Sequence, residues 1–214
     1  MRFTYFTALF LAAGAAVTAQ TSAPAAQAHR SDLGFSYSIP SDWNVADEHP
    51  TLPAVKEQQS QAASSEEEKK GIQCVQLELT AKHGTPASMI VVMQLPFSCF
   101  GQKMTDQELP GFAQGASEGL KQNFDLTEPV YGSYTLGTHS LWIERTRGAV
   151  IGHPEARYTV EIACSVLRLG AVCWMTMAAD DASLQTFEHG KVRLDGEPPV
   201  ALVPASAFDR KPPA

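Results

Sequence analysis

The sequence lacks a surplus of basic residues. It contains 16 Lys and Arg against 23 Asp and Glu in 214 residues, which gives a formal net charge of −7. A surface that follows nucleic-acid phosphates needs an excess of Lys and Arg. The composition therefore argues against a nucleic-acid partner.

Long hydrophobic runs are also missing beyond the N-terminus. The longest later run, Met89 to Leu95, includes a Gln and has the length of a strand, whereas a transmembrane helix needs about 20 apolar residues. An integral membrane protein is therefore not expected. The 14 Pro and 15 Gly are too few for a collagen-like chain, and a hydrophobic fraction of 44% is too high for a wholly disordered one. One globular domain is the expectation.

Sequence patterns for cofactors and metals are absent as well. There is no phosphate-binding loop and no dinucleotide fingerprint, and we predict no cofactor. The histidines have neither an HxxxH nor an HExxH spacing, and we predict no metal site. These histidines are His29, His49, His83, His139, His153 and His189.

The N-terminus has the pattern of a secretory signal peptide over residues 1–19. Arg2 supplies the positive charge, residues 5–17 are mostly apolar, and Val17-Thr18-Ala19 offers small residues for cleavage. A membrane anchor is the alternative, but the apolar stretch is short for a span. We expect a secreted or periplasmic protein that is soluble after cleavage.

Four cysteines in an exported chain favour disulfide bonds, and three pairings are possible. A two-residue loop between two strands places Cys164 directly opposite Cys173, within bridging distance, whereas a three-residue loop shifts the pairing by one residue. Cys74 with Cys99 is the other local bridge. A reactive redox pair is the alternative, but these cysteines lie in strand patterns and not at a helix start.

Beyond the signal peptide, the chain divides into three parts. Residues 20–32 are rich in Ala, Ser and Gln and indicate a flexible leader, and the Pro-rich residues 196–214 indicate a tail. Residues 33–195 indicate one α+β domain. Within it, residues 53–70 have helix-forming residues but almost no apolar stripe, which predicts a weak or solvated helix ending near Gly71.

Alternating apolar residues predict mainly strands joined by hairpins, and hence an antiparallel sheet covered by helices. A capping box at Thr105 and Glu108 precedes one predicted amphipathic helix. Asp180 and Asp181 begin a second, which is predicted to run to Val192. The predicted strands lie near residues 35–39, 43–45, 74–79, 88–95, 129–135, 138–147, 157–167 and 171–179.

Two local patterns are candidate sites. Residues 115–119 (GASEG) match the GxSxG motif of serine hydrolases, with Ser117 as the nucleophile. That motif needs a strand-to-helix turn, and the pattern here is helical throughout. Arg145, Arg147 and Arg157 form the one locally basic cluster, which makes them weak candidates for binding an anionic ligand.

The segment Gly34 to Val45 (GFSYSIPSDWNV) resembles the opening of the PsbP-like superfamily, in which an aromatic strand precedes Pro, small polar residues and Trp. The strand at residues 158–162 and the closing helix from Ala182 resemble that family too. The resemblance implies an α/β/α sandwich and members that bind or assist partners. It carries no catalytic residue set.

Together these patterns predict an exported, non-enzymatic accessory or binding domain whose partner is an unidentified protein or small molecule. A small serine hydrolase using Ser117 and a thiol redox protein using Cys164 and Cys173 are the alternatives.

Overall fold

The computed structural model describes residues 27–45, 57, 60–61 and 65–209. The expectations for the signal peptide, for residues 20–26 and for most of residues 53–65 fall outside this part of the chain. Within it, the strands form one eight-stranded and one four-stranded sheet, and every strand pair is antiparallel. The predicted antiparallel sheet is thus confirmed.

The larger sheet has the order β3-β4-β5-β10-β9-β8-β6, and β7 also pairs with β8. Its strands are β3 (Asn44–Val45), β4 (Gln76–His83), β5 (Ser88–Pro96), β6 (Phe124–Leu126), β7 (Val130–Leu136), β8 (His139–Val150), β9 (His153–Val166) and β10 (Gly170–Ala178). The smaller sheet has the order β1-β2-β11-β12, with β1 (Gln27–Arg30), β2 (Phe35–Ile39), β11 (Lys191–Leu194) and β12 (Val200–Ala201).

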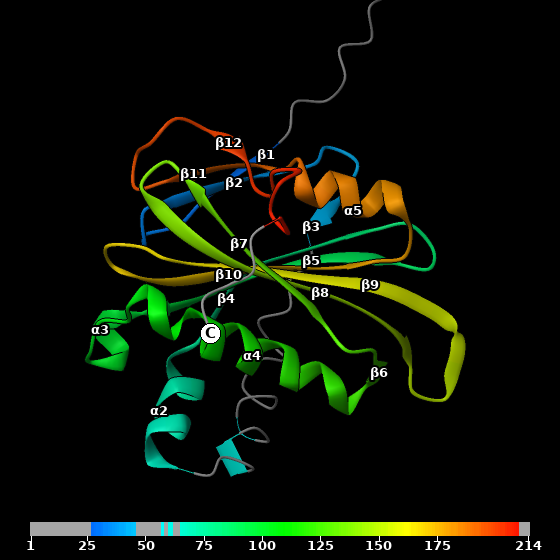
Figure 1. The fold of residues 1–214 in the computed structure, drawn as a ribbon, viewed down its shortest axis with the longest axis horizontal. Coiled ribbons are helices and arrows are strands. Elements are labelled where there is room, and N and C mark those ends of the chain that lie inside the picture. Colours follow the sequence, from blue (N-terminus) through cyan, green and yellow to red (C-terminus); the bar gives the residue numbers. More distant parts are fainter. Residues whose placement is uncertain (1–26, 46–56, 58–59, 62–64, 210–214) are drawn as a thin grey trace, which may run out of the picture.

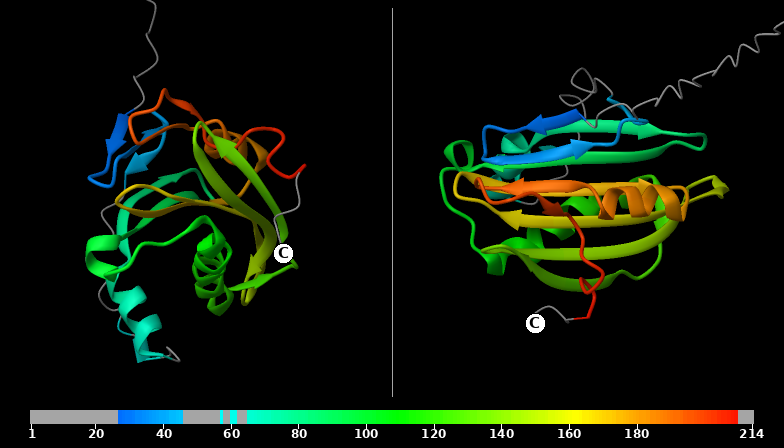
Figure 2. Two further views of the ribbon diagram at one scale, coloured as in Figure 1. Left: turned by 60° about the vertical axis from the view of Figure 1, so that its left-hand side comes forward. Right: turned by 90° about the horizontal axis from the view of Figure 1, so that it is seen from above.

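The two faces of the larger sheet are covered differently (Figure 1). Helix α4 (Leu109–Glu118) packs on one face, where Leu109 and Ala113 join a core cluster with Val160 and Ile162. Figure 2 shows the larger sheet curving around this helix. Helices α2 (Glu66–Cys74), α3 (Phe97–Phe100) and α5 (Asp181–Glu188) lie elsewhere in the fold, with 3₁₀ turns at Asp106–Glu108 and Gly119–Gln122.

The opposite face is covered mainly by the smaller sheet, with α5 beside it. Phe35 of β2 packs edge-on against Trp174 of β10 at 5.5 Å between ring centroids, and Phe187 of α5 lies in the same core cluster. Helical cover on both faces was predicted. It is correct for the α4 face, but four short strands supply most of the cover on the other.

The predicted leader and tail are partly wrong. Gln27–Arg30, within the predicted leader, pairs with β2 as strand β1. In the predicted tail, β12 pairs with β11, and Leu202 and Val203 are buried in the core. These segments have little local pattern, because their partners lie far away in the sequence.

Several element boundaries also differ from those predicted. Helix α2 continues through Gly71 and ends at Cys74, which was assigned to a strand. The closing helix ends at Glu188, and Val192 belongs to β11. The capping box at Thr105 and Glu108 is present as predicted.

Candidate functional site

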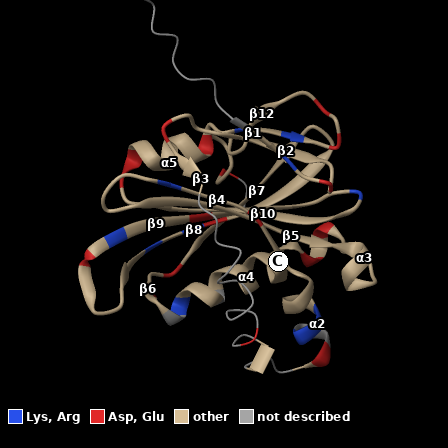
Figure 3. Ribbon diagram, turned by 180° about the vertical axis from the view of Figure 1, so that it is seen from behind, with Lys and Arg blue, Asp and Glu red and all other residues tan. Residues whose placement is uncertain are grey.

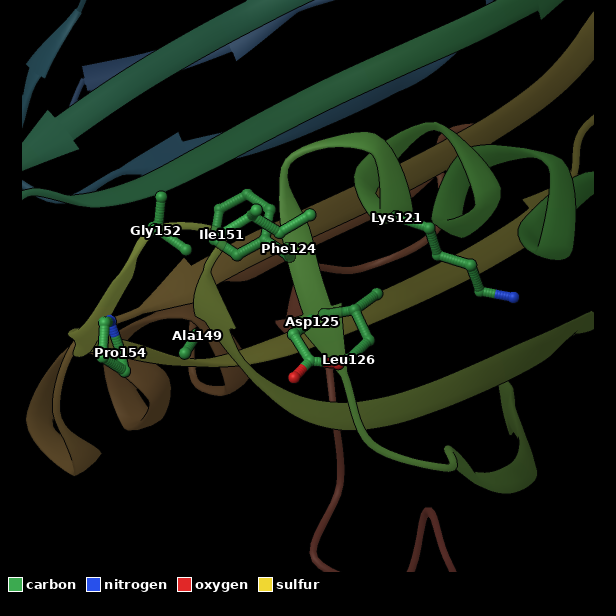
Figure 4. A pocket seen from close by; sticks show the side chains of 9 residues that line it. Lys121, Phe124, Asp125, Leu126, Ala149, Ile151, Gly152 and Pro154 are labelled. Atoms are coloured by element: carbon green, nitrogen blue, oxygen red, sulfur yellow. The ribbon is translucent and has the colours of Figure 1, made fainter.

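An accessible hollow lies at one end of the larger sheet (Figure 4). It has a volume of about 550 Å³ and is formed by β6, the end of β8 and the turn into β9. Most of the side chains that line it are apolar, and the charged ones are one Lys and one Asp. The lining residues are Lys121, Phe124, Asp125, Leu126, Ala149, Val150, Ile151, Gly152 and Pro154.

Apolar side chains extend this surface beyond the hollow. Ile151, at the tip of the β8–β9 hairpin, is 58% exposed, and its backbone N–H donates to the carbonyl of Asn123, which fixes the tip beside β6. Phe124 packs edge-on against Tyr158 at 6.0 Å between ring centroids. We call Phe124, Leu126, Val150, Ile151 and Pro154 the β6 surface. A large exposed Ile beside an apolar hollow is typical of an interaction site.

A partly buried charge cluster lies on the face of the larger sheet that α5 covers. Arg145 of β8 donates from Nε to Oε2 of Glu161 and from a terminal nitrogen to Oε1 of Glu188, both at 2.5 Å. Its guanidinium also lies 4.4 Å from the ring centre of Phe208. One cation is thus shared by two carboxylates and an aromatic ring.

The central member of this cluster is Glu161, whose side chain is 0% exposed. Burial raises its pKa from 4.5 to about 7, since desolvation outweighs the attraction of Arg145, and the charge of Glu188 raises it further. Its second oxygen, Oε1, has no hydrogen-bond partner among the described residues. Burial likewise raises the pKa of Tyr134 well above its ordinary value, with a contribution from the charge of Glu161.

The accessible hollow and the titratable groups with raised pKa are therefore in different places. Glu161, Tyr134 and Tyr37 are buried between the layers, whereas the hollow is lined by apolar side chains of β6 and the β8–β9 turn. General acid–base catalysis needs a shifted group that the substrate can reach.

The predicted arginine cluster is only partly assembled. Arg145 is neutralised by Glu161 and Glu188 and is not available to an anionic ligand. Arg147 and Arg157 lie diagonally across β8 and β9 on one face, Arg147 is exposed, and Nε of Arg157 donates to the carbonyl of Pro154. Figure 3 shows basic and acidic positions interspersed over the described ribbon. The use of Arg147 and Arg157 for an anion stays a prediction.

Sequence reasoning missed Glu161 and the β6 surface. The sequence feature that could have indicated a buried Glu161 is its position between Val160 and Ile162, in a strand that is buried on both faces. Strand β6 has three residues, too few for a recognisable alternation.

Ser117 is not at a strand-to-helix turn. It lies inside α4, is buried, and its hydroxyl donates to the backbone carbonyl of Gln114 at 3.0 Å. The elbow geometry that the GxSxG motif requires is therefore not formed.

We expect Ser117→Ala to change the free energy of unfolding by less than about 1 kcal/mol, because the hydroxyl makes only a local bond to its own helix. We also expect a fluorophosphonate probe to leave Ser117 unlabelled. Both are measured on the purified protein, by urea unfolding and by mass spectrometry. Stoichiometric labelling at Ser117 would restore the hydrolase alternative.

The predicted disulfide pairs are both present. Cys164 of β9 lies directly opposite Cys173 of β10 and is bonded to it, and Cys74 is bonded to Cys99. The two-residue loop Arg168-Leu169 sets this register, as the favoured prediction required. Cys164 and Cys173 are completely buried, in strands.

No group of three or more His, Cys, Asp or Glu side chains in the described ranges is placed to hold a metal ion. None of the helices described is both long and apolar enough to cross a bilayer.

The sequence matches no protein-family model and no curated protein. Among solved structures, the chain is similar to the solution structure of cyanobacterial PsbP (CyanoP) from Synechocystis sp. PCC 6803. The similarity covers 76% of this chain and 85% of that chain, with 10% sequence identity and a TM-score of 0.42. At this TM-score the match carries no argument about fold, function or partner, and the PsbP-like resemblance of the sequence stays a prediction.

Proposed function

We propose that the protein is an exported, non-enzymatic accessory domain that binds a protein partner through the β6 surface. The observation that carries the proposal is the apolar hollow of about 550 Å³ beside Ile151, which is 58% exposed. Its volume lies in the range of ordinary binding sites, and its lining is mostly apolar. An apolar side chain of a partner fits such a hollow.

Export is supported by the N-terminal pattern of residues 1–19 and by the use of cysteine. All four cysteines are paired in disulfides, which persist in oxidising compartments. A secreted or periplasmic location follows from this proposal.

The chemistry of the partner follows from the surroundings of the hollow. Ile151 and the hollow bind an apolar side chain, because removing both from water is favourable. Arg147 and Arg157 extend from the same hairpin on one face of the sheet. A protein segment with carboxylates beside its apolar residue therefore complements this end of the molecule.

The test compares two charged substitutions at hairpin tips. Ile151→Glu places a carboxylate in the β6 surface, whereas Leu169→Glu does the same at the β9–β10 turn, where Leu169 is 42% exposed. Each mature variant is immobilised, and the proteins retained from envelope or culture-medium extract are identified. We expect one partner to be retained by the wild type and by Leu169→Glu but lost by Ile151→Glu, with at least about tenfold weaker affinity when it is purified.

A partner that all three proteins retain equally would place binding elsewhere on the molecule. Loss with Leu169→Glu but not with Ile151→Glu would also contradict the proposal. Both side chains lie at exposed turns, so both variants should fold. Circular dichroism of each variant distinguishes loss of binding from unfolding.

A further inference from the structure

The partly buried charge cluster joins four separate parts of the chain. Arg145 comes from β8, Glu161 from β9 and Glu188 from the end of α5, and Tyr134 of β7 faces Glu161 from the edge of the sheet. Thr176, opposite Glu161 on β10, donates its hydroxyl to the carbonyl of Met89 instead. Arg145 is therefore the cation that Glu161 pairs with, and it is shared with Glu188.

The end of α5 and the C-terminal segment are tied to each other. The backbone carbonyl of Glu188 accepts from the N–H of Val203 at 2.9 Å, and the carbonyl of Gly190 accepts from the N–H of Leu202 at 2.9 Å. The hydroxyl of Tyr134 donates to the carbonyl of Leu202 at 2.8 Å. We call α5 together with residues 200–208 the cap.

Arg145 is a charged contact between the sheet and this cap. It bonds Glu188 on α5 and lies against Phe208 at the other end of the cap. Figure 1 shows α5 and the red C-terminal segment side by side on the same face of the larger sheet. A change in the ion pairs of Arg145 therefore affects both α5 and the C-terminal segment of the cap.

The charge balance of the cluster changes with one proton. With Glu161 protonated, Arg145 and Glu188 form a one-to-one pair beside a neutral acid. With Glu161 ionised, two carboxylates share one guanidinium, and a buried negative charge has an oxygen without a partner. A buried charge that is not compensated is strongly unfavourable.

We infer that Glu161, Arg145 and Glu188 form a proton-operated latch, in which protonation of Glu161 holds the cap against the larger sheet and its ionisation loosens the cap. The latch does not depend on the proposed binding function. Burial raises the pKa of Glu161 to about 7, so the change falls between mildly acidic and mildly alkaline conditions.

Hydrogen–deuterium exchange of the full-length mature protein tests the latch at about pH 6 and about pH 8.5, with labelling times scaled for the intrinsic pH dependence of exchange. We expect peptides from the cap to lose protection by roughly tenfold to hundredfold at the higher pH. Peptides from the β4–β5 hairpin, which lies away from the cluster, serve as the internal control and should keep their protection.

Two variants separate the latch from general instability. Glu161→Gln is neutral at both pH values, so its cap should stay protected at both. Glu188→Gln removes the carboxylate through which Arg145 holds α5, so its cap should already be less protected at about pH 6 and should change little between the two pH values. Cap protection that is independent of pH in the wild type would overturn the latch, and so would an unchanged pH dependence in Glu161→Gln. If Glu161→Gln does not fold, an unchanged pH dependence in Glu188→Gln decides against it.

Discussion

Replacing Arg145 with Met is expected to lower the free energy of unfolding at about pH 8 by about 3–5 kcal/mol. The substitution keeps most of the side-chain volume but removes the cation between Glu161 and Glu188, together with its contact with Phe208. Two carboxylates, one of them completely buried, are then left without compensation. Urea unfolding followed by tryptophan fluorescence measures the difference, since Trp174 is buried in the adjoining core.

The pH dependence of this loss has a definite sign. The pKa of Glu161 is raised from 4.5 to about 7 in the folded state, so the folded state holds the proton more tightly than the unfolded chain. The corresponding stability is fully present below about pH 4.5 and is lost as the pH rises through 7, by up to about 3 kcal/mol. At about pH 5 Glu161 is mostly neutral, and Arg145→Met should then cost only about 1–2 kcal/mol.

Arg147→Met is the matched control for this prediction. Arg147 lies two residues further along β8, on the same face, and is exposed. Its replacement should change the free energy of unfolding by less than about 0.5 kcal/mol at either pH. Equal losses for the two arginine variants, or a loss for Arg145→Met that is the same at both pH values, would show that Glu161 is not held neutral by burial.

Local sequence signals predicted the central part of the fold well. Strands β5, β7, β8, β9 and β10 were recognisable from local sequence alone, either by alternation or by a dense run of apolar residues. The capping box at Thr105 and Glu108 and the N-cap Asp180 make their hydrogen bonds within three residues. The register of Cys164 against Cys173 depends on a loop of two residues. Each of these features is decided by near neighbours in the chain.

The periphery could not be predicted in the same way. Strand β1 forms by backbone pairing with β2. Strand β12 has two residues and is stabilised by pairing with β11. Leu202 and Val203 were assigned to a Pro-rich tail. In the fold, their backbone N–H groups donate to the carbonyls of Gly190 and Glu188. Tertiary contacts override weak local preference in such segments.

The candidate site was missed for a related reason. In the sequence, nothing distinguishes Ile151 from other residues of a turn. It lines a hollow because the fold places it beside β6. The sequence grouped Arg145 with Arg147 and Arg157 because they are neighbours on a hairpin. The fold separates them, since α5 brings Glu188 to Arg145 from 43 residues away.

Removing either disulfide is expected to destabilise the protein by about 3–4 kcal/mol. In the loop-entropy description, the Cys74–Cys99 bond, with a sequence separation of 25, contributes about 3.5 kcal/mol, and the Cys164–Cys173 bond, with a separation of 9, about 2.6 kcal/mol. Both sulfurs of the second pair are buried under α4, so Cys164→Ala with Cys173→Ala also loses about 1 kcal/mol of packing. Urea unfolding of the two double variants measures these losses.

The two bonds should differ most in their response to a reductant. Thiol–disulfide exchange needs access of a thiolate to one of the sulfurs. Cys99 is exposed, whereas Cys164 and Cys173 are both 0% exposed. Mild reduction followed by alkylation and mass mapping should therefore label Cys74 and Cys99 first and leave the β9–β10 pair intact until the protein unfolds. Early labelling of Cys164 and Cys173 in the folded protein would instead support the redox alternative, because it would mean that the strands open readily enough to expose a reactive pair.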